Sequence, residues 1–302
     1  MKNLINNRIL IIGSNGMLGQ RLTEFYKLSG DVELLTCSIE NESFIKNVEY
    51  RKLDITNKSQ VKNIVMDFFP DEIINTAAFT NVDGAEKEKE LAWKINVVGV
   101  KNIARYGQAI DAHVVHISTD YVFDGKNGPY SETDKPNPIG YYGRTKLASE
   151  NELKVSGVRF SVVRTNVLYG PAKYGRPDFV KWVVNSLRDG KEIKIVTDQF
   201  GNPTYIDDLV FGIDAIVERQ AESIYNIGGK DFLTRFEFTM KIVDYFNLDK
   251  SLVKPIITAD LHQLAARPLK SGLLISKAIN ELEYNPHSIN DALRIMGKEL
   301  GL

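Results

Sequence analysis

The chain lacks most of the features that mark secreted, membrane or nucleic-acid-binding proteins. Its 302 residues include one cysteine, Cys37, which excludes an internal disulfide framework and a multi-cysteine metal site. No segment is apolar for long enough to cross a bilayer, and the apolar run that opens the chain is too short for a secretory signal. The formal net charge of −1 gives no reason to expect nucleic acid or a membrane as a partner. We therefore expect a cytoplasmic protein.

The composition, 43% hydrophobic and 25% charged residues, is typical of a globular protein, and predicted strands and helices alternate regularly. Short β-rich runs alternate with helical stretches through the first half of the chain. The runs lie at 8–12, 32–36, 72–76, 113–118 and 160–165. This alternation predicts an α/β fold with a doubly wound parallel sheet, in which ligands bind at the carboxyl ends of the strands.

The rhythm loosens after residue 165, where "YGPAKYGRP" and "DQFGNPT" are typical of loops. We therefore predict a dinucleotide-binding domain at 1–165 and a smaller substrate-binding region at 166–302, whose segments interleave in part with the first domain. The absence of a long linker predicts that the two parts pack closely and share a cleft, where small ligands usually bind.

A glycine loop, "GSNGMLG", follows the first predicted strand and opens a helix. Gly13 would allow the tight turn, Gly16 would let the backbone approach a pyrophosphate, and Gly19 would let the helix pack against the strand. Three glycines alone could form a plain turn. Their place between a strand and a helix favours dinucleotide binding and makes the predicted sheet Rossmann-type.

The region after the second strand, "TCSIE", bears on the choice of dinucleotide. An NAD site usually has an acidic residue at the end of this strand, and here Glu40 comes slightly late. Nothing therefore excludes a 2′-phosphate, and we expect NADPH or NADH, with a lean toward NADPH or toward use of both. Asp54 follows a third strand and could reach the adenine end or cap a helix.

The stretch "YYGRTK" contains Tyr142 and Lys146 four residues apart, and good helix formers follow. Residues i and i+4 share a helix face, so these two side chains should point together. A second Tyr-x-x-x-Lys, Tyr169 with Lys173, contains a glycine and a proline that break a helix. Only the first pair is expected to act jointly, near Ser118, Thr119 and Asp120 at the end of the fifth strand.

These motifs resemble those of the extended short-chain dehydrogenase/reductases, and more closely the dTDP-4-dehydrorhamnose reductase branch. The resemblance spans nearly the whole chain, in seven blocks that occur in the family's order. The blocks are "GSNGMLG", "NTAAFTNVDGAE", "ISTDYVFDG", "PYSETDKPNPIGYYGRTKLASE", "VVRTNVLYG", "DQFGNPT" and "ARPLKSGL". The related 4,6-dehydratases have Asp-Glu after the active-site threonine. This chain has Asp120 and Tyr121, which speaks against dehydration.

The resemblance implies a set of site residues. It implies that Thr119, Tyr142 and Lys146 are catalytic. Tyr142 and Lys146 would also bind the cofactor, together with Gly13, Asn15, Gly16, Met17, Leu18, Gly19, Asp54, Ile55, Ala77 and Ala78. The implied substrate-binding residues are Thr80, Asp120, Tyr121, Val167 and Arg267. We expect no metal site.

The expected chemistry is reduction of a 4-keto-6-deoxyhexose. A lysine charge about 5 Å from a phenol, at an effective dielectric near 20, favours phenolate by roughly 3 kcal/mol, so Lys146 should lower the pKa of Tyr142 by about two units. Thr119 would hold the carbonyl oxygen. Tyr141, on another helix face, should pack or touch substrate only.

The residues around position 166 do not identify the sugar of the substrate. The family often has a tryptophan where this chain has Val167, which predicts a differently shaped sugar pocket. Lys173, Arg176 and Arg267 are candidates for the substrate's diphosphate, or are solvated surface charges. His113 and His116, in a predicted buried strand, are expected to be core residues or to support site residues from behind, rather than to be ligands or acid catalysts.

Three interpretations follow. The first is an NAD(P)H-dependent 4-ketoreductase whose substrate is a nucleotide sugar. For this enzyme the resemblance also implies a homodimer. The second is a reductase or epimerase of another nucleotide-linked keto sugar. The third is a non-catalytic dinucleotide-binding subunit, as in the methionine adenosyltransferase β-subunits.

Overall fold

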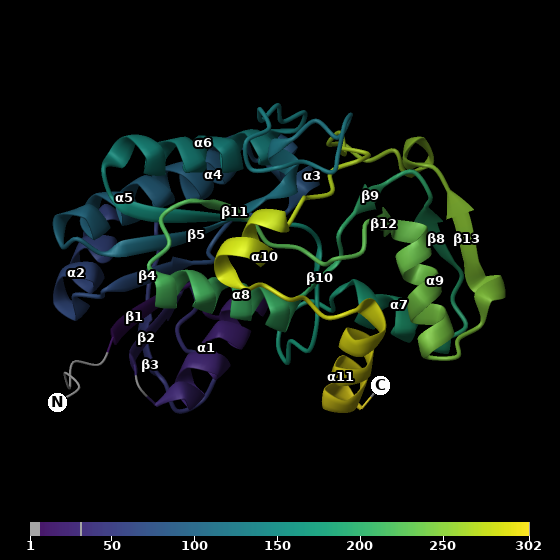
Figure 1. Ribbon diagram of the computed structural model, residues 1–302, viewed down its shortest axis with the longest axis horizontal. Coiled ribbons are helices and arrows are strands. Elements are labelled where there is room, and N and C mark those ends of the chain that lie inside the picture. The colour runs from purple at the N-terminus through teal and green to yellow at the C-terminus, as the bar shows by residue number, and fades with distance from the viewer. Residues whose placement is uncertain (1–6, 31, 302) are drawn as a thin grey trace.

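A seven-stranded parallel sheet forms the centre of the molecule (Figure 1). The computed structural model describes residues 7–30 and 32–301. The strand order across the sheet is β11-β6-β5-β4-β1-β2-β3. The strands are β1 (Asn7–Ile12), β2 (Val32–Ser38), β3 (Glu49–Lys52), β4 (Glu72–Asn75), β5 (His113–Thr119), β6 (Arg159–Thr165) and β11 (Ile224–Asn226). The five predicted strand runs are confirmed to within two residues at each end.

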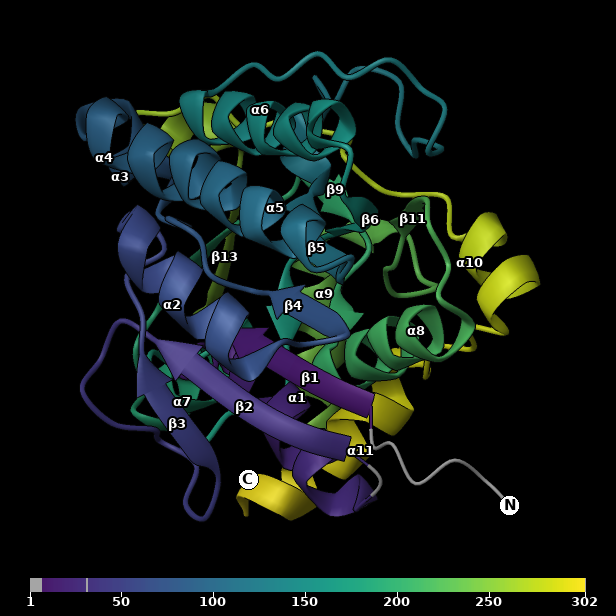
Figure 2. The same ribbon diagram turned by 90° about the vertical axis from the view of Figure 1, so that its left-hand side faces the viewer.

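Helices cover both faces of this sheet, as a doubly wound fold requires. Figure 2 shows α2, α5 and α6 side by side over one face, while α1 and α8 cover the other. The helices that flank the sheet are α1 (Met17–Ser29), α2 (Lys58–Phe68), α5 (Val100–Ala109), α6 (Tyr141–Ser156) and α8 (Ile206–Arg219), and α3 (Val82–Lys87), α4 (Lys89–Trp93) and the π-helical turn η1 (Lys94–Gly99) lead into α5. Because both faces are covered, the central strands are buried, and Ile9, Leu10 and Ile11 of β1 are fully buried. The predicted fold class is confirmed.

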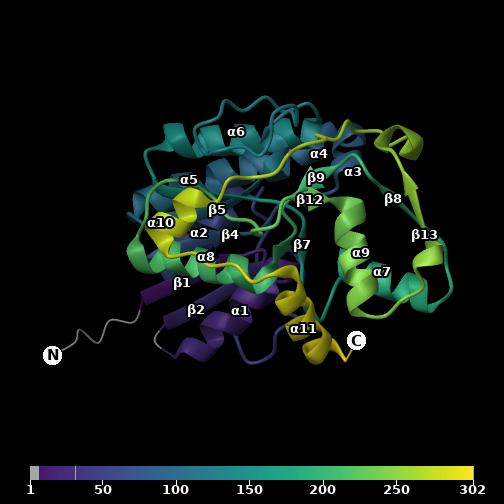
Figure 3. The same ribbon diagram turned by 45° about the vertical axis from the view of Figure 1, so that its right-hand side comes forward.

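The second half of the chain adds a smaller layer beside the sheet. Figure 3 shows α7, α9, β8 and β13 grouped at one side of the molecule. The two-stranded sheets of this half of the chain are β7 (Leu168–Tyr169) with β10 (Thr204–Tyr205), β9 (Phe200–Gly201) with β12 (Leu233–Thr234), and β8 (Ile193–Val196) with β13 (Val253–Ile256). Its helices besides α8 are α7 (Phe179–Arg188), α9 (Arg235–Tyr245), α11 (Ile289–Leu300) and α10 (Ser276–Leu282), which packs on α8 and β11. The chain also returns to the main sheet after residue 165, since α8 packs on α1 and β11 pairs with β6. The division at residue 165 stays a prediction, and interleaving of this kind was part of it.

The topology creates a crevice at the point where strand order reverses. β1 lies between β2 and β4, so the chain runs outward from β1 in both directions. The loops at the carboxyl ends of β1 and β4 therefore diverge and leave a space between them. The predicted ligand site lies at this edge.

Candidate active site

One cleft of about 670 Å³ runs along the carboxyl edge of the sheet. It gathers segments that are far apart in the sequence, from the ends of β1 to β6 and the start of α6. Of the predicted site residues, the cleft is lined by Gly13, Gly16, Met17, Leu18, Gly19, Asp54, Ile55, Ala77, Ala78, Thr80, Thr119, Asp120, Tyr121, Tyr142, Lys146 and Val167. The structure thus brings together all of them except Asn15 and Arg267.

The glycine loop at one end of the cleft has the close contacts that its sequence predicts. A Cβ on Gly19 would lie 2.2 Å from the carbonyl oxygen of Gly13, so only glycine lets the helix pack this closely on the loop. Gly13 has a φ of +86°, and a Cβ there would lie 2.6 Å from the Ala77 nitrogen. Gly16 caps α1 without a side-chain hydrogen bond. The first N–H groups of α1 therefore face the cleft unpaired within the helix, which suits a pyrophosphate.

Asn15 belongs to the glycine loop but does not line the cleft. Its Nδ2 donates to the Glu40 carboxylate (3.1 Å) and to the Glu42 carbonyl oxygen (2.9 Å), while its Oδ1 accepts from the Phe44 N–H (2.9 Å). These bonds fix the segment after β2. Because Glu40 itself lines the cleft, Asn15 holds an acidic side chain at the place where a dinucleotide's adenosine ribose is expected.

Asp54 lines the cleft at the end of β3 and stabilises its own turn. Its Oδ1 accepts from the N–H and the hydroxyl of Thr56, at 2.9 and 2.7 Å. The N-cap of α2 is Asn57, so Asp54 does not cap this helix. Its predicted place near the adenine end stays a prediction.

At the other end of the cleft, Tyr142 and Lys146 are one turn apart on α6. The Lys146 ammonium donates to the Ile117 carbonyl oxygen at 2.6 Å. Burial lowers the pKa of Lys146 to about 8. The Tyr142 ring meets the Tyr121 ring edge to face, with centroids 5.9 Å apart. Tyr141 lies outside the cleft lining, under the side chain of Lys89, in line with a packing role.

The expected lowering of the Tyr142 pKa by Lys146 is wrong: the pKa is raised, and Lys146 is not among the groups that shift it. Burial raises the pKa of Tyr142 well above its ordinary value, and the nearby Asp120 adds to the increase, while a hydrogen bond with Thr119 opposes it. The expectation placed the ammonium against the phenol. In the fold, the Lys146 ammonium instead donates a hydrogen bond to the backbone of β5, at the carbonyl oxygen of Ile117.

Thr119 and Asp120 form the floor of the cleft beside Tyr142. The Thr119 hydroxyl donates to the Asp120 carboxylate at 3.0 Å, and Ser271 donates to its other oxygen at 2.5 Å. Burial nevertheless raises the pKa of Asp120 to about 6. Ser271 belongs to the "ARPLKSGL" block, so a segment 151 residues away in the sequence contacts the cleft residue Asp120.

Two buried polar atoms near this floor have no partner among residues 7–30 and 32–301. They are Thr165 Oγ1 and Asn166 Oδ1, in the two residues where β6 ends. Both residues line the cleft. Since buried polar groups are almost always satisfied, these atoms fit a bound molecule with hydroxyl or amide groups.

A smaller hollow continues from the cleft toward the second half of the chain. It shares Asp120, Tyr121, Asn166 and Val167 with the cleft and adds Arg235, the first residue of α9. Arg235 stacks on the Phe179 ring at 4.7 Å and takes part in none of the ion pairs found among the described residues. Burial lowers its pKa. No spacing in the sequence marks Arg235, although it directly follows the helix-capping residue Thr234.

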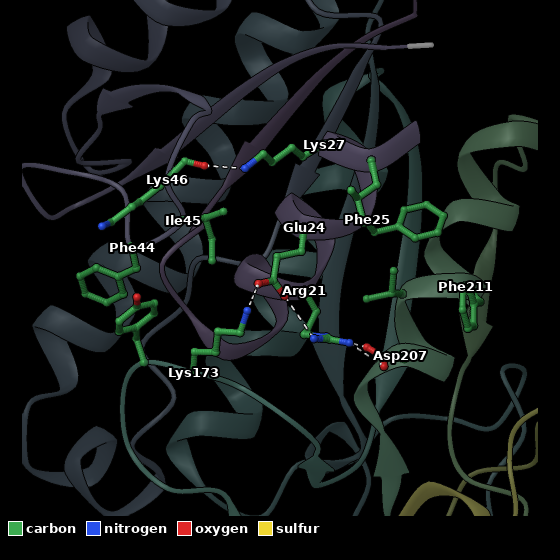
Figure 4. A pocket seen from close by; sticks show the side chains of 13 residues that line it. Arg21, Glu24, Phe25, Lys27, Phe44, Ile45, Lys46, Lys173, Asp207 and Phe211 are labelled. Carbon is green, nitrogen blue, oxygen red and sulfur yellow. Dashed lines mark hydrogen bonds and ion pairs between the residues drawn. The ribbon is translucent and has the colours of Figure 1, made fainter. Parts of the chain in front are cut away.

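The three basic residues proposed for a diphosphate lie elsewhere. Arg267 donates to the Asp83 carboxylate at 2.7 Å and does not line either hollow. Lys173 pairs with Glu24 in a separate hollow between α1 and α8, of about 610 Å³ (Figure 4). Arg176 is exposed and lines none of these hollows.

The hollow of Figure 4 has its charges largely paired within the protein. Arg21 bonds Asp207 through two nitrogens, at 2.7 and 2.8 Å, and also contacts Glu24. Lys27 donates to the Lys46 carbonyl oxygen. None of the predicted catalytic or cofactor-binding residues lies there, so the sheet-edge cleft is the candidate active site.

The two β5 histidines are core residues, as expected. His113 is fully buried between Glu72 (2.8 Å) and Ser161 (3.0 Å). His116 is buried beside Lys146. In the part of the chain that the structure describes, no three His, Cys, Asp or Glu side chains are grouped to hold a metal ion, and no helix is long and apolar enough to cross a membrane.

Comparison with known proteins agrees with this geometry. The family model of the RmlD substrate binding domain matches residues 7–301. The chain belongs to this family. The predicted resemblance is therefore confirmed.

Individual relatives of this RmlD-family chain match it along most of their length. It is 33% identical to dTDP-4-dehydrorhamnose reductase of Aggregatibacter actinomycetemcomitans, over 95% of this chain and 97% of that protein. A Bacillus anthracis dTDP-4-dehydrorhamnose reductase structure, in complex with NADP, superposes with a TM-score of 0.88 at 34% identity, covering 98% of this chain and all of that one. The methionine adenosyltransferase 2 subunit beta of Xenopus tropicalis is 30% identical over 82% of this chain and 75% of that protein.

Proposed function

We propose that this chain uses NADPH or NADH to reduce the 4-keto group of a nucleotide-linked 6-deoxyhexose, in the manner of dTDP-4-dehydrorhamnose reductase. The observation that carries the proposal is the cleft itself. It has a glycine loop and helix N-terminus at one end and Thr119, Tyr142 and Lys146 at the other. The names of the bacterial relatives support the same substrate. We place the reaction in the cytoplasm.

The residues of the cleft fit a dinucleotide. The first N–H groups of α1, with Gly16 at its cap, would bind the pyrophosphate, and Lys146 would hydrogen-bond the nicotinamide ribose. Glu40 and Asp54 would lie near the adenosine. When bound, the nicotinamide supplies the hydride.

Tyr142 would supply the proton at the C4 oxygen of the sugar. Its raised pKa keeps the phenol protonated at neutral pH, so the proton is in place before the reaction. Its transfer to the developing alkoxide makes the alcohol and leaves a phenolate. Lys146, one turn along α6 and hydrogen-bonded to Ile117, would act on that phenolate only through its charge, and Thr119 would hold the carbonyl oxygen in line.

The rest of the substrate would extend into the smaller hollow. Arg235 presents a guanidinium there without an acidic partner among the described residues, which suits a diphosphate. Val167 is 37% exposed at the junction of cleft and hollow, and its small side chain would leave room beside the sugar. This feature keeps another nucleotide-linked keto sugar as the alternative substrate.

The test is oxidation of NADPH and NADH by the purified protein with dTDP-4-dehydrorhamnose and other nucleotide keto sugars. Tyr142→Phe should reduce turnover at least a hundredfold, because general acid catalysis contributes about 10²–10⁴ in rate. Tyr141→Phe is the matched control, since the neighbouring phenol lies outside the cleft. Equal activity of both variants would contradict the assigned acid.

A second candidate is a non-catalytic, dinucleotide-binding subunit. Similarity to a methionine adenosyltransferase β-subunit favours it. Tight dinucleotide binding without turnover on any keto sugar would support this role. We also propose a homodimer, which light scattering after size-exclusion chromatography would test.

A further inference from the structure

His116 is buried directly behind the proposed catalytic lysine. We propose that His116 is a positioning residue for Lys146: Asn75 and Ser149 hold its ring in one tautomer, which presents an N–H to the lysine Nζ and favours the amine over the ammonium. The inference rests on the proposed function only for its effect on turnover, because the contact itself exists within the chain.

The contacts around the ring are specific. His116 Nε2 lies 3.2 Å from Lys146 Nζ and 3.0 Å from the Ser149 hydroxyl. Its Nδ1 lies 3.1 Å from Asn75 Nδ2. These side chains come from β5, α6 and β4, and His116 is 1% exposed.

The ring is neutral, so one of its nitrogens carries a proton and the other accepts. Burial lowers the pKa of His116 well below its ordinary value, and the Lys146 charge lowers it further. A protonated imidazole would place two cations 3.2 Å apart in the core.

The hydrogen bonds around the ring decide which nitrogen carries the proton. The Ala77 N–H donates to Asn75 Oδ1 at 3.2 Å, which turns Asn75 Nδ2 toward the ring. His116 Nδ1 therefore accepts, and its proton lies on Nε2. The Ser149 hydroxyl donates to the Lys146 carbonyl oxygen at 2.6 Å and so can accept from Nε2–H. Every donor in this chain of hydrogen bonds meets an acceptor.

The consequence for Lys146 follows from the shared Nε2–H. An ammonium has no lone pair and meets this N–H as a second donor, whereas an amine can accept from it. Burial acts in the same direction, and the pKa of Lys146 is lowered to about 8. Lys146 is thereby able to change charge close to physiological pH.

Other charged groups near Lys146 are few and do not replace this effect. On α6 they are Tyr142 one turn before and Glu150 one turn after, and Glu150 is paired with Arg164 of β6. Asp120 and Tyr121 follow β5. The residues that face the site from β4 and η1, Asn75 and Asn96, are neutral. Glu150 favours the ammonium, which is opposite to the effect proposed for His116.

The direct test is the titration of Lys146 in protein labelled at lysine ¹³Cε, with the signal assigned by its loss in Lys146→Met. In His116→Gln the side-chain amide can turn its oxygen to the ammonium, so we expect the titration midpoint to rise by about one pH unit. In Ser149→Ala the Nε2–H has only Lys146 left as an acceptor, so the midpoint should fall. His113→Gln is the control, since this buried β5 histidine does not touch Lys146.

Turnover provides a second measurement. If Lys146 must be charged to support Tyr142, kcat/KM falls above pH about 8 and the falling limb moves to higher pH in His116→Gln, but not in His113→Gln. An unchanged ¹³Cε midpoint in both His116→Gln and Ser149→Ala would overturn the inference, whatever the activity. A shifted midpoint in a protein that reduces no keto sugar would uphold the inference and count against the proposed function.

Discussion

Arg164 and Glu150 form a bidentate ion pair that is completely buried between β6 and α6. Arg164 Nη2 lies 2.7 Å and Nε 3.0 Å from the two Glu150 oxygens, and the Ser118 hydroxyl donates to Glu150 at 2.7 Å. The pair thus joins the helix that carries Tyr142 and Lys146 to the strands that end at the cleft.

Loss of one partner of this pair should be costly. Glu150→Gln leaves the buried guanidinium without a counter-charge, and we expect the free energy of unfolding to fall by about 3–5 kcal/mol. Urea denaturation measures it. Glu152→Gln on the same helix removes only an exposed contact with Lys101 at 3.5 Å, so its effect should stay within about 0.5 kcal/mol. Similar losses in the two variants would show that burial of the first pair does not matter.

Two glycines of the loop should have different roles, Gly19 in folding and Gly16 in ligand binding. Gly19→Ala places a Cβ 2.2 Å from a backbone oxygen and should destabilise the fold by several kcal/mol, about the cost of overpacking or more. The nearest contact of a Cβ at Gly16 is 3.3 Å, so Gly16→Ala should fold almost normally and lose dinucleotide affinity. Thermal unfolding and fluorescence titration with NADH distinguish the two effects. Unchanged NADH affinity in Gly16→Ala would place the pyrophosphate elsewhere.

Glu40 moves the expected cofactor preference toward NADH. Hydrogen bonds from Ser38 and Asn15 lower the pKa of Glu40 despite some burial, so the carboxylate is charged beside the cleft. Lys146 is the single basic residue among the described residues that line the cleft, and it lies at the other end. A 2′-phosphate would thus meet repulsion. We expect Glu40→Gln to raise kcat/KM for NADPH relative to NADH about tenfold. Glu42→Gln, whose backbone alone bonds Asn15, is the control.

Asp120 should make stability depend on pH. Its pKa is about 6 in the fold against 3.8 in the unfolded chain, so the folded state binds the proton more tightly. Its stabilising effect is complete below pH about 4 and is lost as the pH rises through 6. Asp120→Asn should therefore be more stable relative to the parent at pH 7.5 than at pH 4.5, by about 2 kcal/mol.

Asp124 is the contrasting case for the same urea experiment. The Lys126 N–H and the Tyr130 hydroxyl donate to Asp124 and lower its pKa. Its contribution is therefore present at neutral pH and lost in acid, so Asp124→Asn should be less stable than the parent at pH 7.5. The same pH dependence in both variants would contradict the burial argument for Asp120.

The substrate's diphosphate should distinguish two arginines. Arg235→Gln removes a guanidinium that faces the smaller hollow, and KM for the nucleotide sugar should rise tenfold or more, since a charge-assisted hydrogen bond contributes about 1.5–3 kcal/mol. Arg267→Gln removes a partner of Asp83 and should change KM little. A larger rise in KM for Arg267→Gln than for Arg235→Gln would instead place Arg267 at the substrate's diphosphate.

The sequence by itself determined the local features of this protein. Alternating apolar runs specified the strands, because a parallel strand buried on both faces needs continuous Val and Ile. The spacing of Gly13 and Gly19 specified the turn into the helix, because the close contacts at Gly19 are with Gly13 and Ser14 of the same loop. The helical spacing of Tyr142 and Lys146 placed them on one face, because the α-helix repeats every 3.6 residues.

Only the tertiary structure decided the contacts between distant segments. It turned Lys146 toward Ile117 and His116, brought Ser271 onto Asp120, and placed Arg235 rather than Arg267 at the hollow. It also brought Glu40 to the cleft through Asn15. Sequence spacing fixes directions within one element, but a pKa and a binding pocket depend on which elements pack together and on how much water they exclude.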